Sequence, residues 1–346
     1  MVLAAWLPLL AAIGCGDDAP KGKAPPAPKN LAHQRLHAPG EVRLTSAGAE
    51  PRVRLRYRLE PGQYQGFRTS VSVKHRAAGQ TSSLTAVLDW ERRVTGVSAG
   101  WAQAEVSVRK VRLARPASIR EDVVRRLMAM SLRFAIDARG RARATARGAA
   151  TARTRATARG AARGTGLAAP MTNGILEILT APLPADAVGH GATWERYEPV
   201  TLTLPKTNLK VRLGVRTRYT LALIKRGGRE RYAQITSRIQ LTAHSPGPTP
   251  GASRAAWAAG PRVTGGGQGT GEIKIDLNHA TVVSAKSDIT LDLSLIEKSR
   301  TRTLKQTTTT STRAINLRPR PRRPRPRPTG STPHPYPTPP RPAAPG

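Results

Sequence analysis

Cysteine, aromatic residues and acidic residues are all scarce in this chain of 346 residues. Its single cysteine, Cys15, has no second thiol for an intramolecular disulfide, so the folded part must be stable through its core alone. Five Trp, six Tyr and two Phe are too few for the stacking platform of a single-strand nucleic-acid binder. Only 21 Asp and Glu oppose 57 Lys and Arg, which gives a formal net charge of +36. A charged partner is therefore expected to be acidic.

Motifs for catalysis and cofactor binding are also missing from the sequence. No Gly-x-Ser-x-Gly elbow is present for a hydrolytic serine. The glycine-rich run at 265–271 leads into a predicted strand, whereas a phosphate-binding loop leads into a helix, so we interpret it as a flexible connection. His33 and His37 have the i, i+4 spacing of metal ligands, but they lie in a proline-rich stretch without a nearby acidic ligand. The sequence therefore predicts no enzyme, no cofactor and no metal site.

Cys15 follows an apolar stretch at the start of the chain. Residues 2–13 are apolar, Gly14 is small, and Gly16 and two aspartates come after the cysteine. This order is typical of a bacterial lipoprotein signal, in which residues 1–14 are removed and the cysteine receives acyl chains such as palmitate. The stretch is shorter than the roughly 20 residues that a transmembrane helix needs. The alternatives are an ordinary secretory signal and a buried strand with an incidental cysteine.

Lipidation of Cys15 would place the mature protein in the cell envelope. Two or more acyl chains anchor a protein stably in a membrane, whereas one chain binds only marginally. Residues 15–40 are rich in proline and lack apolar periodicity, so we expect an extended tether. Gly16 follows the cysteine, whereas aspartate at this position retains enteric lipoproteins in the inner membrane. We therefore expect attachment to the outer membrane, facing either the periplasm or the cell exterior.

Two segments of low complexity hold much of the positive charge. Residues 138–166 form an insertion rich in Ala, Arg and Thr, and residues 298–346 form a tail rich first in Thr and then in Arg and Pro. Neither segment contains an acidic residue or an apolar stripe, so both are expected to be disordered. Compositional drift in a GC-rich genome is the alternative to a functional role. If the tail binds a polyanion, the candidate residues are Arg318, Arg320, Arg322, Arg323, Arg325 and Arg327.

The clearest periodicity in the chain lies at 52–59. A period of two predicts a strand with one buried and one solvated face. The solvated face would present four arginines about 7 Å apart, which suits an acidic polymer, although a face without a partner is the alternative. The apolar residues Val53, Leu55, Tyr57 and Leu59 alternate with Arg52, Arg54, Arg56 and Arg58.

Further alternation predicts an antiparallel sheet in two halves, 41–137 and 167–297. We expect a mainly β fold, a curved antiparallel sheet or half-barrel, with one or two short helices at 119–128 and 173–179. The two halves are either a duplication or sets of strands that resemble one another by default. The alternating segments are 67–73, 84–90, 102–108 and 130–136 in the first half, and 201–204, 211–223, 235–241, 273–277 and 289–295 in the second.

Four short motifs lie within residues 50–297. They are Tyr57-Arg-Leu-Glu-Pro-Gly62, Phe134-Ala-Ile-Asp-Ala-Arg-Gly140, the stretch from Leu183-Pro184 through Val188-Gly189 to Trp194, and Gly271-Glu-Ile-Lys-Ile-Asp-Leu277. These motifs resemble those of a family of uncharacterised bacterial lipoproteins with a β-rich domain of unknown function. The resemblance implies a β-rich fold and an envelope location, and it brings no catalytic residues.

Three functions fit these observations. The first is a non-catalytic, lipid-anchored envelope protein. The second is a carrier or sensor that holds an apolar ligand in the concave sheet, which requires a pocket that stays open after the core has packed. The third is a binder of lipopolysaccharide or another acidic envelope polymer through the basic faces. Nucleic acid is not an expected partner, because export removes the chain from most of it.

Overall fold

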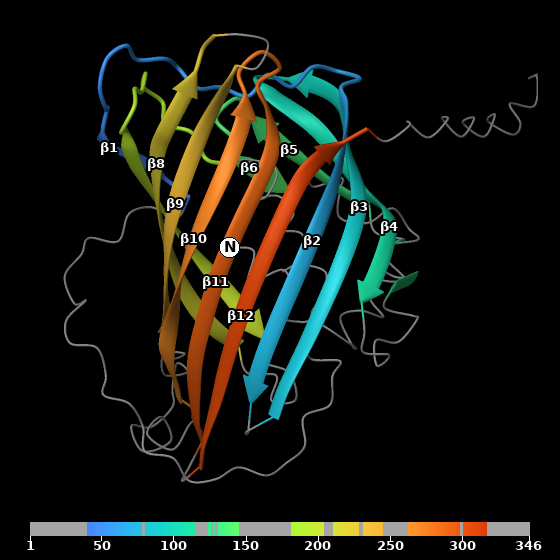
Figure 1. The fold of residues 1–346 in the computed structure, drawn as a ribbon, viewed down its shortest axis with the longest axis vertical. Helices are drawn as coiled ribbons and strands as arrows, with labels where there is room; N and C mark the ends of the chain where they lie inside the picture. The colour runs from blue at the N-terminus through green and yellow to red at the C-terminus, as the bar shows by residue number, and fades with distance from the viewer. Residues whose placement is uncertain are drawn as a thin grey trace, which may run out of the picture.

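The computed structural model describes the strands of one sheet and several of their connections (Figure 1). The described residues are 40–77, 80–114, 124–125, 128, 131–144, 181–203, 210–227, 231–244, 262–297 and 300–316. The twelve strands are β1 (Val42–Ser46), β2 (Tyr64–Ala77), β3 (Gln80–Ser98), β4 (Trp101–Ala114), β5 (Ser131–Asp137), β6 (Ala142–Ala144), β7 (Thr193–Thr203), β8 (Lys210–Lys225), β9 (Tyr232–His244), β10 (Arg262–Asp276), β11 (Thr281–Glu297) and β12 (Arg300–Ile315).

The sheet is built from two runs of sequential antiparallel strands. From β2 to β6, and again from β7 to β12, each strand pairs with the next one along the chain. β12 then pairs with β2 and joins the two runs, and β1 adds to β7 at the far edge. In Figure 1 the sheet curls, so that β5 and β6 lie behind β10 and β11. The expected mainly β fold with a curved antiparallel sheet is therefore confirmed.

The concave side of the sheet is apolar and the convex side is polar. Leu88 and Trp90 of β3 are buried, and Phe67 of β2 stacks on Trp90 with ring centroids 4.3 Å apart. They belong to one cluster of buried side chains from β2 to β5 and β7 to β11. On the convex side, Arg68 Nε lies 2.6 Å from Asp89 Oδ1 in a two-bonded ion pair. The period of two along each strand produces this division.

A crossing segment, residues 47–62, passes over one end of the sheet. Val53 makes an isolated bridge with Val188, and the Tyr57 N–H donates to the carbonyl of Ala138 (2.8 Å). These bonds tie the chain that follows β1 to the turn between β5 and β6, so the two edges of the sheet are linked at this end.

The prediction of a strand at 52–59 is wrong, although the predicted alternation of burial is present. Leu55 and Tyr57 are buried in a second apolar cluster that also contains Trp194. The backbone of this segment bonds to three separate turns or loops instead of forming a ladder with one strand. A period of two belongs to any extended chain with one buried side, so it does not reveal whether a neighbouring strand pairs with it.

Two segments that were predicted to lie outside the sheet are strands of it. The glycine-rich run at 265–271, expected to be a connection, lies inside β10. The tail, expected to begin at 298, starts with β12, which pairs with both β11 and β2. Both errors arise because these strands lack alternating apolar residues, since glycine fills one face of β10 and threonine fills both faces of β12.

Several predictions lie outside the described residues. These are Cys15, the tether, nearly all of both predicted helices, and the tail beyond residue 316. Of the insertion at 138–166, only its first residues are described, and Ala142–Ala144 form the edge strand β6. In the part of the chain that the structure describes, no helix is long and apolar enough to cross a membrane.

Glycines line the inner face of β10 because neighbouring backbone occupies the space of a side chain. A Cβ on Gly267 would overlap the carbonyl oxygen of Thr290 and lie 2.9 Å from Leu241 Cδ1. The same face holds Gly265, Gly269 and Gly271, each close to the backbone of β11 or to a side chain of β9.

Replacing Gly267 with alanine is expected to lower the free energy of unfolding by about 1 to 3 kcal/mol, because the backbone must shift to admit the methyl group. The matched control is Gly96→Ala on β3, where a Cβ would meet nothing within 4 Å. This change is expected to alter stability by less than about 0.5 kcal/mol. Urea unfolding measures both values, and equal losses would contradict the close approach at β10.

Candidate functional site

A polar row on the inner face of β12 interrupts the apolar wall. Gln306, Thr308, Thr310 and Thr312 alternate along this strand, and none is more than 2% exposed. Alternate residues of a strand project to the same side, so the four side chains face the interior together. The buried residues of the neighbouring β11 cluster are Ile, Leu and Ala. The row therefore lies within a mainly apolar lining.

One end of the polar row is fully hydrogen-bonded. Thr312 Oγ1 lies 2.9 Å from Thr69 Oγ1, which accepts a hydrogen bond of 2.8 Å from Trp90 Nε1. Buried polar groups are usually paired in this way, because leaving one unpaired costs about 1 to 3 kcal/mol. These three side chains consequently stabilise the wall and have no need of a further partner.

Further along the row, three buried oxygen atoms have no hydrogen-bond partner. They are Gln306 Oε1, Thr310 Oγ1 and Ser287 Oγ. Ser287 of β11 stands directly opposite Thr310 in the strand register, so their two hydroxyl groups belong to one place on the wall. Gln306 Nε2 donates to Thr308 Oγ1 (3.0 Å), which leaves the amide oxygen as an acceptor. These atoms can bind a polar group that enters the interior.

Arg92 of β3 brings a positive charge into the interior. Its side chain is only 1% exposed, and Nη2 donates to Gln65 Oε1 at 2.7 Å, whereas Nη1 has no partner. Its guanidinium carbon lies 5.9 Å from the centre of the Phe67 ring. Burial lowers the pKa of Arg92 to about 10 and outweighs the opposite effect of Tyr57. The side chain therefore remains cationic at neutral pH.

A second arginine of the described residues, Arg196, also shares a face with buried apolar residues, but it has an acidic partner. Arg196 of β7 alternates with the buried Trp194 and Val200, and its Nη2 lies 2.8 Å from Glu198 Oε2. Among the described residues, no carboxylate pairs with Arg92 in this way. Arg92 is unusual in this respect, because a buried charge is normally paired with one of opposite sign.

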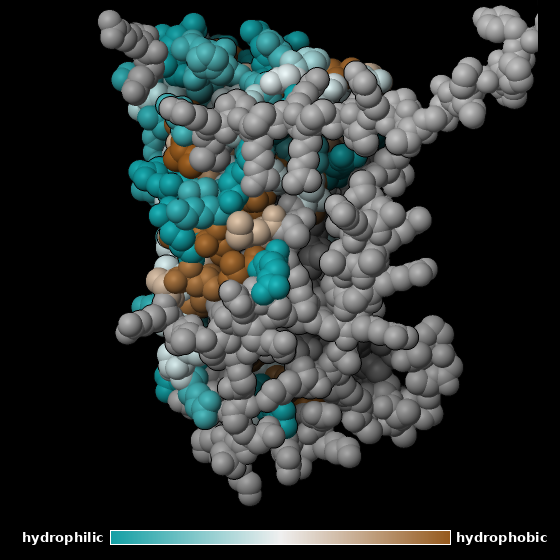
Figure 2. All heavy atoms as spheres, turned by 90° about the vertical axis from the view of Figure 1, so that its right-hand side faces the viewer, coloured by the Kyte–Doolittle hydropathy of each residue, from teal (hydrophilic) through white to brown (hydrophobic). Residues whose placement is uncertain are grey.

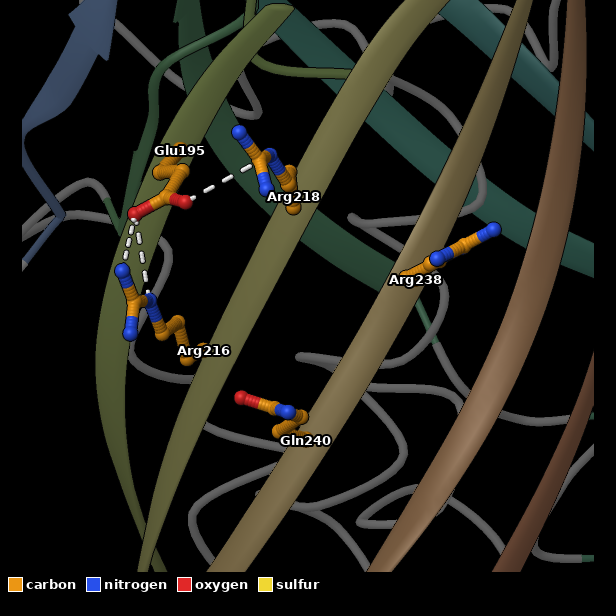
Figure 3. A pocket seen from close by; sticks show the side chains of 5 residues that line it. All are labelled: Glu195, Arg216, Arg218, Arg238 and Gln240. Atoms are coloured by element: carbon orange, nitrogen blue, oxygen red, sulfur yellow. Dashed lines mark hydrogen bonds and ion pairs between the residues drawn. The ribbon is translucent and has the colours of Figure 1, made fainter. Parts of the chain in front are cut away.

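The outer face carries a basic hollow of about 250 Å³ (Figure 3). Glu195 of β7 accepts hydrogen bonds from Arg216 at 2.6 and 3.1 Å and lies 3.6 Å from Arg218 Nε. Arg218 of β8 stands directly opposite Arg238 of β9, so two like charges face each other. Gln240 completes the lining. The hollow has more positive than negative charge and suits a small anion, but it opens to solvent, where ion pairs contribute little.

The structure places the four arginines predicted to form a basic face on the crossing segment. Arg52 Nε lies 3.2 Å from Glu50 Oε1, and Arg56 donates to the carbonyls of Pro184 (2.8 Å) and Ala185. Arg54 and Arg58 are exposed. Two of the four side chains are thus engaged within the protein, and polyanion binding by this group stays a prediction. Cys15 and the six arginines of the tail lie outside the described residues.

Arg92, Ser287 and the polar row of β12 form an interior site, and the sequence predicted none of its residues. The alternation that was recognised on β3 ended at Trp90, and one more step of two residues reaches Arg92. An arginine in register with buried apolar residues is therefore a usable signal. The row on β12 gave no such signal, because a run of threonines has the same residue type on both faces.

Comparisons with known proteins assign no family. No family model matches the chain, and no curated protein matches it. Among solved structures, the chain has a weak similarity to an outer membrane channel from Pseudomonas putida F1, with 8% identity, coverage of 75% of this chain and 97% of that chain, and a TM-score of 0.16. A TM-score of this size supports no conclusion about fold or function. Within the described residues, no group of His, Cys, Asp and Glu could hold a metal ion.

Proposed function

We propose that this chain is a lipid-anchored, non-catalytic envelope protein that holds an amphiphilic ligand against the concave side of its sheet. The observation that carries the proposal is the set of buried, unpartnered oxygen atoms at Gln306, Thr310 and Ser287. A core that served stability alone would gain from apolar residues at these positions, because unpaired buried polar groups are destabilising.

The composition of the concave side supports this proposal. Sites for small molecules are lined mainly by apolar side chains, with a few polar groups that orient the ligand. The concave wall has this composition, since the polar row of β12 faces an interior lined by Val, Leu, Ile and Phe. The convex side, with its ion pairs, suits contact with water.

A route for the ligand is expected beside the end of β4. The pairing of β4 with β5 covers only Trp101 to Ser107, and β4 continues to Ala114. Figure 2 looks onto the side of the molecule where β4 lies and shows apolar residues gathered at mid-height on the left of that view. Val111 and Leu113 from the unpaired half of β4 pack against the core. Opening along this edge would break no pairing between β4 and β5.

The membrane anchor belongs to the same proposal. Acyl chains on Cys15 and a tether of residues 15–40 would keep the sheet close to a source of amphiphiles. We propose the outer membrane as its location, on the basis of Gly16. The alternatives are an envelope scaffold without a ligand and a binder of acidic polymers, for which the basic outer hollow offers a surface.

The test uses the full chain with Cys15→Ala, so that its own acyl chains do not compete. An uncharged fluorescent probe, N-phenyl-1-naphthylamine, is expected to bind saturably to one site and to be displaced by 1-dodecanol. Exchanging both unpartnered hydroxyl residues, Thr310→Val with Ser287→Ala, should weaken dodecanol binding about fivefold, as expected for one lost hydrogen bond. The same exchange should raise the thermal midpoint by about 2 to 4 °C, because it removes unpaired buried groups.

The matched control is Thr309→Val, on the exposed outer face of the same strand. It is expected to change neither dodecanol affinity nor the thermal midpoint appreciably. Absence of saturable probe binding would overturn the proposed function in favour of a scaffold. A fall in the midpoint of the double variant would show that the two hydroxyl groups serve the fold.

A further inference from the structure

Arg92 is the strongest unexplained feature of the interior. A guanidinium group that is 1% exposed, without a carboxylate partner among the described residues, retains a charge in surroundings that disfavour it. Breaking a buried ion pair by removing one partner is strongly destabilising, because it leaves an uncompensated charge. Arg92 is in that position in the protein as it stands. An anion that enters the interior would complete the pair.

One nitrogen atom of the Arg92 guanidinium group has no hydrogen-bond partner. Gln65 Nε2 donates to the carbonyl of Val282 (2.9 Å), which orients Gln65 Oε1 toward Arg92 Nη2. Tyr57, the nearby phenol, donates its hydroxyl to the carbonyl of Ala181 (3.2 Å). Both neighbours are thus fixed by other partners, and Nη1 is left without one. The site has a preorganised, charged donor and, in the part of the chain that the structure describes, no competing acid.

We propose that Arg92 binds the head group of a long-chain amphiphile that carries a single negative charge, either a carboxylate or a phosphodiester. This inference rests on the proposed function, because it names the chemistry of the ligand held by the concave wall. Arginine forms short, charge-assisted hydrogen bonds with the oxygen atoms of both groups. One cation matches one negative charge, whereas a phosphate monoester would bring a second charge without a partner.

The remaining wall fits an acyl chain. In the strand register, Arg92 stands opposite Gln65 and Gln306 stands opposite His75. Gln65 and His75 lie near opposite ends of β2. Ten residues at about 3.3 Å each place these two levels about 33 Å apart. An acyl chain of a membrane lipid spans half of a hydrocarbon core of about 30 Å, so the apolar wall is long enough to hold one.

The experiment compares two ligands that differ only in the head group. Dodecanoate and 1-dodecanol displace N-phenyl-1-naphthylamine from the full chain with Cys15→Ala at pH 8, where the carboxyl group is ionised. The chain is expected to bind dodecanoate at least about 10-fold more tightly than dodecanol. Arg92→Met should reduce dodecanoate affinity by about 10- to 100-fold, as expected for a lost charged hydrogen bond, and leave dodecanol affinity within twofold.

Two further variants separate head-group binding from folding. Arg92→Lys retains the charge and should keep part of the preference for dodecanoate, so it serves as the test if Arg92→Met does not fold. Arg93→Met, at the neighbouring position on the other face of β3, should keep the whole preference. Displacement by lysophosphatidylglycerol, which carries a phosphodiester, then shows whether the fatty acid or the phospholipid head group binds more tightly.

The outcomes distinguish this inference from the proposed function. Saturable probe binding with equal affinities for dodecanoate, lysophosphatidylglycerol and dodecanol would overturn the assignment of Arg92 and leave the carrier intact. The same conclusion would follow if Arg92→Met kept the full preference for the anion. Absence of any saturable binding would overturn both proposals together.

Discussion

Replacing Trp194 with alanine is expected to lower the free energy of unfolding by about 3 to 5 kcal/mol. The indole is fully buried, stacks on Tyr219 with ring centroids 5.7 Å apart, and donates from Nε1 to the carbonyl of Pro182 (2.8 Å). Alanine would leave a cavity and remove that donor. Trp194 belongs to the cluster under the crossing segment, so this loss measures how much the linked end of the sheet contributes to stability.

Urea unfolding at 25 °C measures this change, with Trp101→Ala as the matched control. Trp101 is partly exposed at the start of β4 and lies under the Arg143 guanidinium at 4.0 Å. Its removal is expected to cost about 1 kcal/mol, the value of a cation–π contact near the surface. Equal losses for the two variants would contradict the role of the second apolar cluster.

Exchange of Cys15 for alanine is expected to move the protein from the membrane fraction to the soluble fraction. Two acyl chains contribute about 0.8 kcal/mol for each buried CH₂ group, far more than a few lysines of the tether can supply. Fractionation of cells that express the two proteins measures the effect.

A salt wash provides the control for this experiment. Electrostatic attachment through the basic residues weakens as ionic strength rises, whereas lipid anchoring does not. Wild-type protein is expected to stay in the membrane fraction at high salt. Retention of the Cys15→Ala protein there would show that Cys15 carries no anchor.

Sequence periodicity predicted most of the sheet, because its inner face is apolar and its outer face is polar. The alternation at 84–90, 102–108 and 235–241 identified strands β3, β4 and β9. It also placed Leu55 and Tyr57 inside, although their segment crosses the strand ends. Side-chain alternation records which side of a chain is buried. It does not record which backbone groups pair.

The strands that were missed lack this contrast in side-chain polarity. In β10, glycine at 265, 267, 269 and 271 replaces the apolar residues of the inner face, because neighbouring backbone fills that space. In β12, threonine at 307–310 occupies both faces. Both strands are held in the sheet by pairing with a strand on either side. These pairings join residues that are distant in the sequence.

The interior site was hidden for a related reason. Charged and hydroxyl residues on a strand are usually solvated, so the sequence favoured an outer basic face at residues 52–58. The structure instead buries Arg92 and the polar row of β12. Their importance depends on which atoms lack partners, and this is a property of the packed structure.

Calorimetric titration of dodecanoate into the full chain with Cys15→Ala is the most direct test of a ligand site on the concave wall. The expected result is one site per chain, with a negative heat-capacity change that reports burial of the acyl chain. Arg92→Met is expected to weaken this binding by about 10- to 100-fold. A titration without saturable heat, or saturable binding with no change in heat capacity, would contradict an interior that holds an amphiphile.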